Sequence, residues 1–299
     1  MMSENYFQKR QKLRIGDQPF FVNFNNSTKH PRLESFTEMI IISCCPRLTV
    51  KSITFMIFLI DIAIYIGCFY YAGIDNNGEL FTPNQKALFD FGQKYPYFII
   101  YQKQFERFIG SMFLFANFKH ILVSLVCLLV FGSYVEALIG FKKMFLIYII
   151  GGYSGTLVSC LMSDSPGVDG TNPVASFLGV LFGFLLIKWD KWDYPGSGRT
   201  QMLMILMFGL TAIFTLGYIF TLVDTLAMVG SLLIGVLFIF GVFEEADDNR
   251  YASNDSYIAK IKQQNENNKC SRYFSLFLII FYLVCGTLAF FFMRTPKII

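Results

Sequence analysis

Few side chains in this sequence could carry acid–base or nucleophilic chemistry. Histidine is the side chain whose charge changes nearest to neutral pH, and the chain has two, His30 and His120. His30 lies in a polar N-terminal segment, whereas His120 begins an apolar stretch with Ser124 four residues later. No carboxylate or second metal ligand lies near His120 in sequence, so it is either a binding residue or, more commonly, a hydrogen-bonded structural group. We expect no metal site and no cofactor.

The apolar character of the chain determines the elements that must position these residues. It is 54% hydrophobic, 18% aromatic and only 15% charged, which leaves too little polar surface for a water-exposed fold. Runs long enough to cross a bilayer as helices occupy 53–73, 111–134, 144–162, 201–221, 222–243 and 273–293, and a shorter run covers 174–187. The sequence therefore predicts an all-α, multi-pass membrane protein with seven membrane helices.

Charge predicts the orientation of the helices. Most of the 25 Lys and Arg residues fall on the side that holds the N-terminus when loops are assigned alternately to the two faces, so that side should face the cytosol or the matrix. The net charge of +4 is spread around helix ends and interleaved with acids, which argues against nucleic-acid binding. The seven cysteines suggest no disulfide framework.

The chain divides into four expected parts. Residues 1–50 form a peripheral segment on the basic side, 51–243 a six-helix membrane domain, 244–272 a polar linker, and 273–299 a seventh helix with its tail. We expect no cleavable signal peptide, because the first strongly apolar run is long enough to span. Cys44 and Cys45 could be acylated. Asp61, inside the first span, is either part of a pathway or a hydrogen-bonded residue facing the bundle.

The short run 174–187 implies an unusual feature. It rises about 21 Å as a helix, less than the roughly 30 Å hydrocarbon core, so the preceding polar loop SDSPGVDGTNP must reach into the membrane. Irregular backbone at that depth is tolerated only where protein buries it or water reaches it. This pattern predicts a cavity that opens on the less basic side. Asn172 before Pro173 predicts an N-cap for this helix.

The stretch from Arg107 to Gly140 resembles the rhomboid intramembrane proteases. The resemblance rests on Arg107, the aromatic FLFANF segment, His120, Phe131-Gly132, Glu136 and Gly140, which fall in the family's order and spacing, and it covers about residues 100–242. It implies a rhomboid-like six-helix bundle with one further C-terminal helix. Arg107, Gly132, Glu136 and Gly140 are then architectural.

The same resemblance implies that the catalytic pair has been lost. Gly179 and Gly183 set the register of the helix that carries the family's serine, and Val174 falls at the serine position within Asn-Pro-Val-Ala. On the sixth helix, the run that begins Val-Asp224 and is followed by Gly235 has Met228 at the position of the catalytic histidine.

The oxyanion positions are also changed. The family's His-x-x-x-Asn corresponds to His120 and Ser124, and an earlier histidine corresponds to Phe115. A shifted alignment would nominate Ser176, which lies about 200° around the helix from position 174. Gly179 and Gly183 on one helix, with Ser231 and Gly235 on the other, form two small-residue faces that predict close packing.

These features lead to three functional hypotheses. The first is a catalytically inactive scaffold or accessory subunit of a membrane complex, with other integral membrane proteins and lipids as partners. The second is a pseudoprotease that binds transmembrane clients and directs their trafficking or degradation, and the third, remote, is an active serine protease. The sequence leaves open the mitochondrial inner membrane and a secretory-pathway membrane.

Overall fold

A computed structural model describes residues 52–75, 81–189, 198–220, 222–243, 263, 266 and 268–295. The peripheral segment 1–50, Cys44 and Cys45, and most of the linker 244–272 lie outside the described residues. The described part contains helices and two isolated bridges, with no strand. Its membrane helices are α3 (Ile53–Ala72), α7 to α8 (Phe118–Ile139), α9 (Phe141–Met162), α10 (Asn172–Ile187), α11 (Gly198–Ile219), α12 (Thr225–Val242) and α14 (Lys269–Met293).

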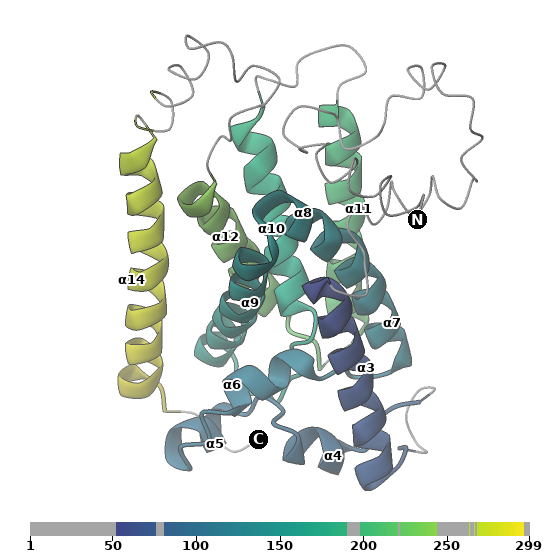
Figure 1. The fold of residues 1–299 in the computed structure, drawn as a ribbon. Coiled ribbons are helices and arrows are strands. Elements are labelled where there is room, and N and C mark those ends of the chain that lie inside the picture. Colours follow the sequence, from purple (N-terminus) through teal and green to yellow (C-terminus); the bar gives the residue numbers. More distant parts are fainter. Residues whose placement is uncertain are drawn as a thin grey trace, which may run out of the picture.

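The described chain is an all-α polytopic membrane protein, as the sequence predicts. Six of these helices are long and apolar enough to cross a membrane, and α10 is the shorter apolar one. In Figure 1, α10 runs through the middle of the bundle, with α9 and α12 on one side and α7 and α11 on the other, while α14 stands beside α9 and α12. Almost all of α10 is buried.

Glycine lets α10 and α12 approach backbone to backbone, as the small-residue spacing predicts. A Cβ added to Gly179 would lie 3.1 Å from the Cα of Gly235 and much closer to the carbonyl oxygen of Leu232. A Cβ added to Gly235 would collide with the carbonyl oxygen of Ser176, and one added to Gly183 would collide with the Ile239 side chain and lie 3.2 Å from the Val236 carbonyl oxygen. The two helices are held together by contacts that no larger side chain would permit.

Helix α9 closes the other side of α10. Gly151 receives the side chain of Ser176, and Gly155 receives Ser231 from α12. The Ser231 hydroxyl donates to the Gly151 carbonyl at 2.9 Å, which bonds α12 to α9 directly. Small residues on all three helices therefore form the centre of the bundle.

The second span departs from the predicted run. The sequence predicts a start near 111, but α7 begins at Phe118, because Ser111–Phe113 form a 3-10 turn and Leu114 is extended. Asn117 caps α7 by accepting a bond from the His120 amide at 2.9 Å. The span then widens into a π-helical turn at Leu128–Gly132 before continuing as α8 (Ser133–Ile139), a local irregularity often found at functional sites.

Glu136 of α8 holds the start of α3. Its carboxylate accepts bonds from the Ile53 and Thr54 amides at 3.2 and 3.1 Å and from the Thr54 hydroxyl at 2.7 Å. These amides belong to the first turn of α3, where no carbonyl within the helix can pair with them. Gly132 lies against the Thr54 side chain, and Gly140, with φ +82°, makes the turn from α8 into α9.

Arg107 organises the long connection between α3 and α7, which contains the short helices α4 (Gln85–Asp90), α5 (Pro96–Tyr101) and α6 (Arg107–Gly110). Its guanidinium donates to the carbonyls of Phe89 and Gln93, both at 2.9 Å, and to Gln104 at 2.6 Å. It also stacks over the Phe89 ring at 4.3 Å.

The C-terminal helix α14 packs on α9 and α12. The Tyr282 hydroxyl donates to the Ser154 carbonyl at 3.2 Å, and Tyr153 and Thr287 share a hydrogen bond of 2.8 Å. At its end, Arg294 pairs with Asp164 at 2.9 Å. Only a narrow face of α14 is buried, so most of its surface is available to lipid or to another membrane helix.

The glycine contact between α10 and α12 yields a direct prediction. Gly235→Ala should lower the stability of the protein by about 1–3 kcal/mol, because the added methyl overpacks against backbone that cannot move aside. Gly67→Ala on α3 is the matched control, since its Cβ would meet only Phe91 ring atoms at 3.7 Å and more. Thermal unfolding in detergent measures both, and equal melting temperatures for the two variants would contradict the packing argument.

Candidate functional site

The first turn of α10 is the centre of the candidate site, and Val174 lies there in an apolar setting. Val174 is buried within the main hydrophobic cluster. Pro173 packs against Gly152 of α9. The N-cap is Thr171, with no side-chain capping bond, so the prediction that Asn172 caps the helix was wrong. Asn172 instead lies inside the first turn, facing Gly155 of α9, and its side-chain nitrogen has no hydrogen-bond partner among the described residues.

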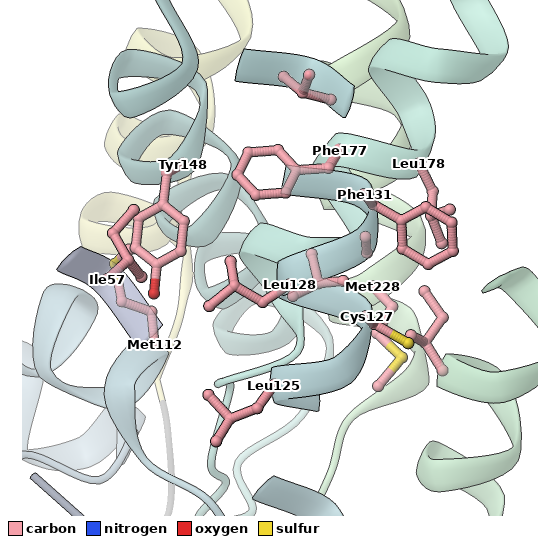
Figure 2. Packing of buried hydrophobic residues seen from close by; sticks show 14 of the residues in the cluster. Ile57, Met112, Leu125, Cys127, Leu128, Phe131, Tyr148, Phe177, Leu178 and Met228 are labelled. Carbon is pink, nitrogen blue, oxygen red and sulfur yellow. The ribbon is translucent and has the colours of Figure 1, made fainter. Parts of the chain in front are cut away.

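Met228 lies in the first turn of α12, buried in the same cluster as Val174. Its methyl group lies near Gly217 of α11. Figure 2 shows it among buried side chains of the second span, including Cys127, Leu128 and Phe131, and of α10, including Phe177 and Leu178. The pair of positions that the resemblance marks is therefore filled by two apolar side chains.

The two serines that the sequence marks near the site, Ser176 and Ser124, both make structural hydrogen bonds. Ser176 donates to the Pro173 carbonyl at 2.6 Å and points toward α9, where its hydroxyl also lies 3.4 Å from the Ile147 carbonyl. Ser124 donates to the carbonyl of His120 at 2.7 Å, within its own helix. Among the residues that the structure describes, neither hydroxyl bonds to a histidine ring.

His120 is fully buried at the start of α7. Its Nδ1 accepts a bond from the Ala116 amide at 3.0 Å, so the neutral ring carries its proton on Nε2. That Nε2 has no partner among the described residues. Phe115 packs edge-on to the ring, and Phe220 stacks on it with centroids 6.2 Å apart. His120 is a buried donor enclosed by aromatic rings.

A buried charged cluster, which sequence reasoning missed, lies beside this site. Lys94 has no exposed surface; its ammonium bonds to the hydroxyl of Ser159 on α9 and pairs with Asp224 at 3.6 Å. The Ser159 hydroxyl in turn donates to Asp224. The sequence does place Lys94 in an aromatic loop that contains proline, which is an unusual setting for a lysine. Nothing in the sequence indicates that this loop packs against the start of α12.

Asp169 continues this cluster toward α6. Its carboxylate accepts a bond from Thr156 at 3.0 Å, while its other oxygen has no partner among the described residues. Burial raises the pKa of Asp169, an effect that the nearby Lys94 and the hydrogen bonds from Thr156 and Ser111 only partly offset. Asp169 therefore resists ionisation in the folded protein.

The arrangement limits the possible chemistry. Ser159 and Lys94 have the residue types of a serine–lysine pair, but Lys94 also pairs with the Asp224 carboxylate, and the Ser159 hydroxyl donates to that carboxylate and not to the lysine. No group of three or more His, Cys, Asp or Glu residues that could hold a metal ion occurs in the part of the chain that the structure describes. Asp61 is buried in α3 with one oxygen unpartnered among those residues.

A buried six-helix membrane core around a short central helix, with a polar loop entering at the start of that helix, defines a class of intramembrane-protease-like proteins. The model of the Rhomboid domain family matches residues 102–245. The chain therefore contains a Rhomboid domain over about half of its length.

Similar curated proteins cover only part of each sequence. The chain is 28% identical to RHOMBOID-like protein 7 of Arabidopsis thaliana over 48% of this chain and 46% of that protein. It is 25% identical to Rhomboid-like protease 2 of Toxoplasma gondii over 64% and 65%, and 29% identical to Inactive rhomboid protein 1 of Drosophila melanogaster over 35% and 7%. The chain spans about half the length of the first Arabidopsis relatives it matches.

The raised pKa of Asp169 predicts how stability depends on pH. When a carboxyl group has a higher pKa in the folded than in the unfolded state, the folded protein becomes less stable as the pH rises from the unfolded pKa through the folded one. Asp169→Asn removes that loss and keeps an oxygen to accept from Thr156. The melting temperature of the variant relative to the natural protein should therefore increase between pH 4 and pH 7. A difference that stays constant or falls with pH would contradict the assignment.

Proposed function

We propose that this rhomboid-family protein is catalytically inactive and acts as a scaffold or accessory subunit of a membrane protein complex. The observation that carries the proposal is the pair Val174 and Met228. Both positions lie in the buried hydrophobic cluster, and neither side chain can act as a nucleophile or as a base.

The geometry of the surrounding hydroxyls supports the loss of proteolysis. A serine nucleophile needs a base within hydrogen-bond distance, and Ser176 and Ser124 both donate to backbone carbonyls instead. His120 is the one histidine in the described residues, and its contacts are a backbone amide and aromatic rings. No arrangement of these groups assembles a nucleophile and base.

Loss of both catalytic partners is also compatible with a stable fold. Replacing both members of a buried hydrogen-bonded pair with apolar groups can be nearly neutral, whereas replacing one leaves the other unsatisfied. Val174 and Met228 are both apolar, so neither position leaves a polar partner unsatisfied at the other. The protein can therefore keep the glycine-packed bundle without keeping the chemistry, and the name of one relative, Inactive rhomboid protein 1, is consistent with this proposal.

A scaffold role suits the outer surface. Large apolar side chains are exposed on α11 and along α14, including Met204, Met207, Phe208, Tyr273, Phe274, Phe277, Ile280, Phe281 and Phe292. Such faces can pack against lipid or the helices of other integral membrane proteins. The inner side of α11 is packed against the second span, where Gly209 lies against the Phe131 ring.

Labelling with a serine-directed fluorophosphonate tests the inactivity. We expect no labelling of the purified protein under conditions that label an active rhomboid protease assayed in parallel, because no described serine hydroxyl bonds to a histidine ring and the hydroxyl of Ser159, beside Lys94, donates to Asp224. Labelling that disappears in Ser176→Ala or in Ser159→Ala would overturn the proposal and identify the nucleophile.

Restoring the catalytic residue types should not restore cleavage. In the variant Val174→Ser with Met228→His, the oxyanion site is still incomplete: His120 is retained, but Ser124 bonds within its own helix and Ala175 and Pro173 replace the family's residues around the serine. Removing one oxyanion donor alone can cost about 10²–10³ in rate. Measurable cleavage of a transmembrane substrate by this variant would show that the site is less altered than proposed.

The two non-catalytic hypotheses differ in the stability of the partner complex. Native electrophoresis of gently solubilised membranes, followed by mass spectrometry, should give a single stoichiometric complex if the protein is a subunit. Scattered sub-stoichiometric partners would favour the client-binding pseudoprotease. Fractionation of the same membranes decides between the mitochondrial inner membrane and a secretory-pathway membrane, with the N-terminus proposed on the matrix or cytosolic side.

A further inference from the structure

We propose that Asp61 is a neutral carboxylic acid that binds a water molecule together with Tyr148, and that this site fastens the middle of α3 to α9. Both residues lie outside the set on which the rhomboid resemblance rests. The site is therefore independent of the proposed loss of catalysis, and it assigns a role to a buried acid that the rest of the bundle leaves unexplained.

Asp61 lies near the middle of α3, a helix whose other residues carry no charge. It is 3% exposed, and its Oδ1 has no hydrogen-bond partner among the described residues. The ion pairs of the described chain do not include it. A carboxylate at this depth without a cation is strongly unfavourable. The Asp61 carboxyl group therefore keeps its proton.

Tyr148 of α9 is the polar side chain that faces this part of α3. Ile57 and Asp61 lie one turn apart on the buried face of α3. In Figure 2 the Tyr148 ring lies beside Ile57 and Met112, with its hydroxyl at the end nearer to them. Tyr148 and Asp61 are close enough for an electrostatic interaction, but Oδ1 of Asp61 receives no hydrogen bond from the phenol.

The two groups are chemically suited to share a water molecule. A neutral carboxylic acid and a phenol each offer one O–H donor and an acceptor oxygen. A buried polar group without a hydrogen bond is costly, and buried waters commonly bridge such groups. The other neighbours of Tyr148 are Ile57, Met112 and the rings of Phe113 and Phe177. These apolar side chains provide no ligands for a metal ion, so the site favours a small neutral molecule.

A bridge at Asp61 would complete the polar attachments of α3. Towards the start of the helix, the Thr54 hydroxyl donates to a carboxylate of α8 at 2.7 Å. Towards its end, the Tyr65 hydroxyl donates to the Phe81 carbonyl, also at 2.7 Å. Asp61 lies between them on the same buried face. Only a minor part of α3 is buried, so a link from Asp61 to Tyr148 would hold the middle of the helix against the bundle.

Infrared spectroscopy of the detergent-solubilised protein tests the state of the carboxyl group. A protonated carboxyl absorbs at a higher frequency than a carboxylate, and hydrogen bonding lowers that frequency. The spectrum of the natural protein minus that of Asp61→Asn should contain a protonated-carboxyl band. In Tyr148→Phe, which removes only the phenolic hydroxyl, this band should move to higher frequency because the shared water loses one partner.

Tyr282→Phe is the matched control for this measurement. Its hydroxyl donates to the Ser154 carbonyl, elsewhere on α9, so the Asp61 band should keep its position in this variant. A carboxylate band in place of the protonated one, or a band that Tyr148→Phe leaves unmoved, would overturn the proposal.

A double-variant cycle measures the link between the two helices. Asp61→Leu and Tyr148→Phe each leave the opposite group without its bridge, so each should lower the melting temperature. The double variant should lose less than the sum of the two single losses. Asp61→Leu combined with Tyr282→Phe should instead give additive losses. Additive losses for Asp61→Leu with Tyr148→Phe would count against the link.

A crystal structure of the natural protein locates the bound molecule and requires no variant. We expect electron density for a water molecule within hydrogen-bond distance of both the Asp61 carboxyl group and the Tyr148 hydroxyl. A direct bond between the two side chains, or no density beside Oδ1, would rule out the water site. None of these measurements depends on fluorophosphonate reactivity, so failure of this proposal is distinguishable from failure of the proposed inactivity.

Discussion

The backbone contact between α10 and α12 is the constraint on which the rest of the structure depends. Gly179 and Gly235 bring the two helix backbones together without intervening side chains, so the first turns of both helices lie in one buried cluster. Small residues of α9 then fit against both helices, with Ser231 bonded to the Gly151 carbonyl. In a membrane, where apolar lipid provides no hydrophobic driving force between helices, this close packing is a major source of stability.

This packing explains how the chain can keep the rhomboid fold with apolar residues at positions 174 and 228. The glycines, Glu136 and Arg107 act on backbone groups: Glu136 on the first amides of α3, and Arg107 on carbonyls of the α3–α7 connection. None of these bonds depends on the residues at 174 and 228. The bonds that maintain the fold are therefore independent of the side chains at the two catalytic positions. For this reason the function is proposed from the residues of the site and not from family membership.

Buried charged residues lie close to the two apolar positions 174 and 228. Beside the apolar pair Val174 and Met228 lies a cluster in which Lys94, Ser159 and Asp224 satisfy one another. Buried charges are tolerated only when paired and hydrogen-bonded. This charged cluster thus lies where the loop containing Lys94 meets α9 and the start of α12.

The sequence by itself determined the all-α membrane class and the approximate spans. The lengths of the apolar runs and the spacing of the glycines within them are local properties that can be read directly along the chain. It misplaced the start of the second span, where Asn117 caps a helix after an extended turn, and the capping of α10, because Thr171 and not Asn172 precedes that helix. Only the tertiary structure brought Lys94 to Asp224, 130 positions later in the chain. The physical reason is that an ion pair between distant loops forms only when the packing of the helices brings those loops together. The hydropathy of the sequence does not specify that packing.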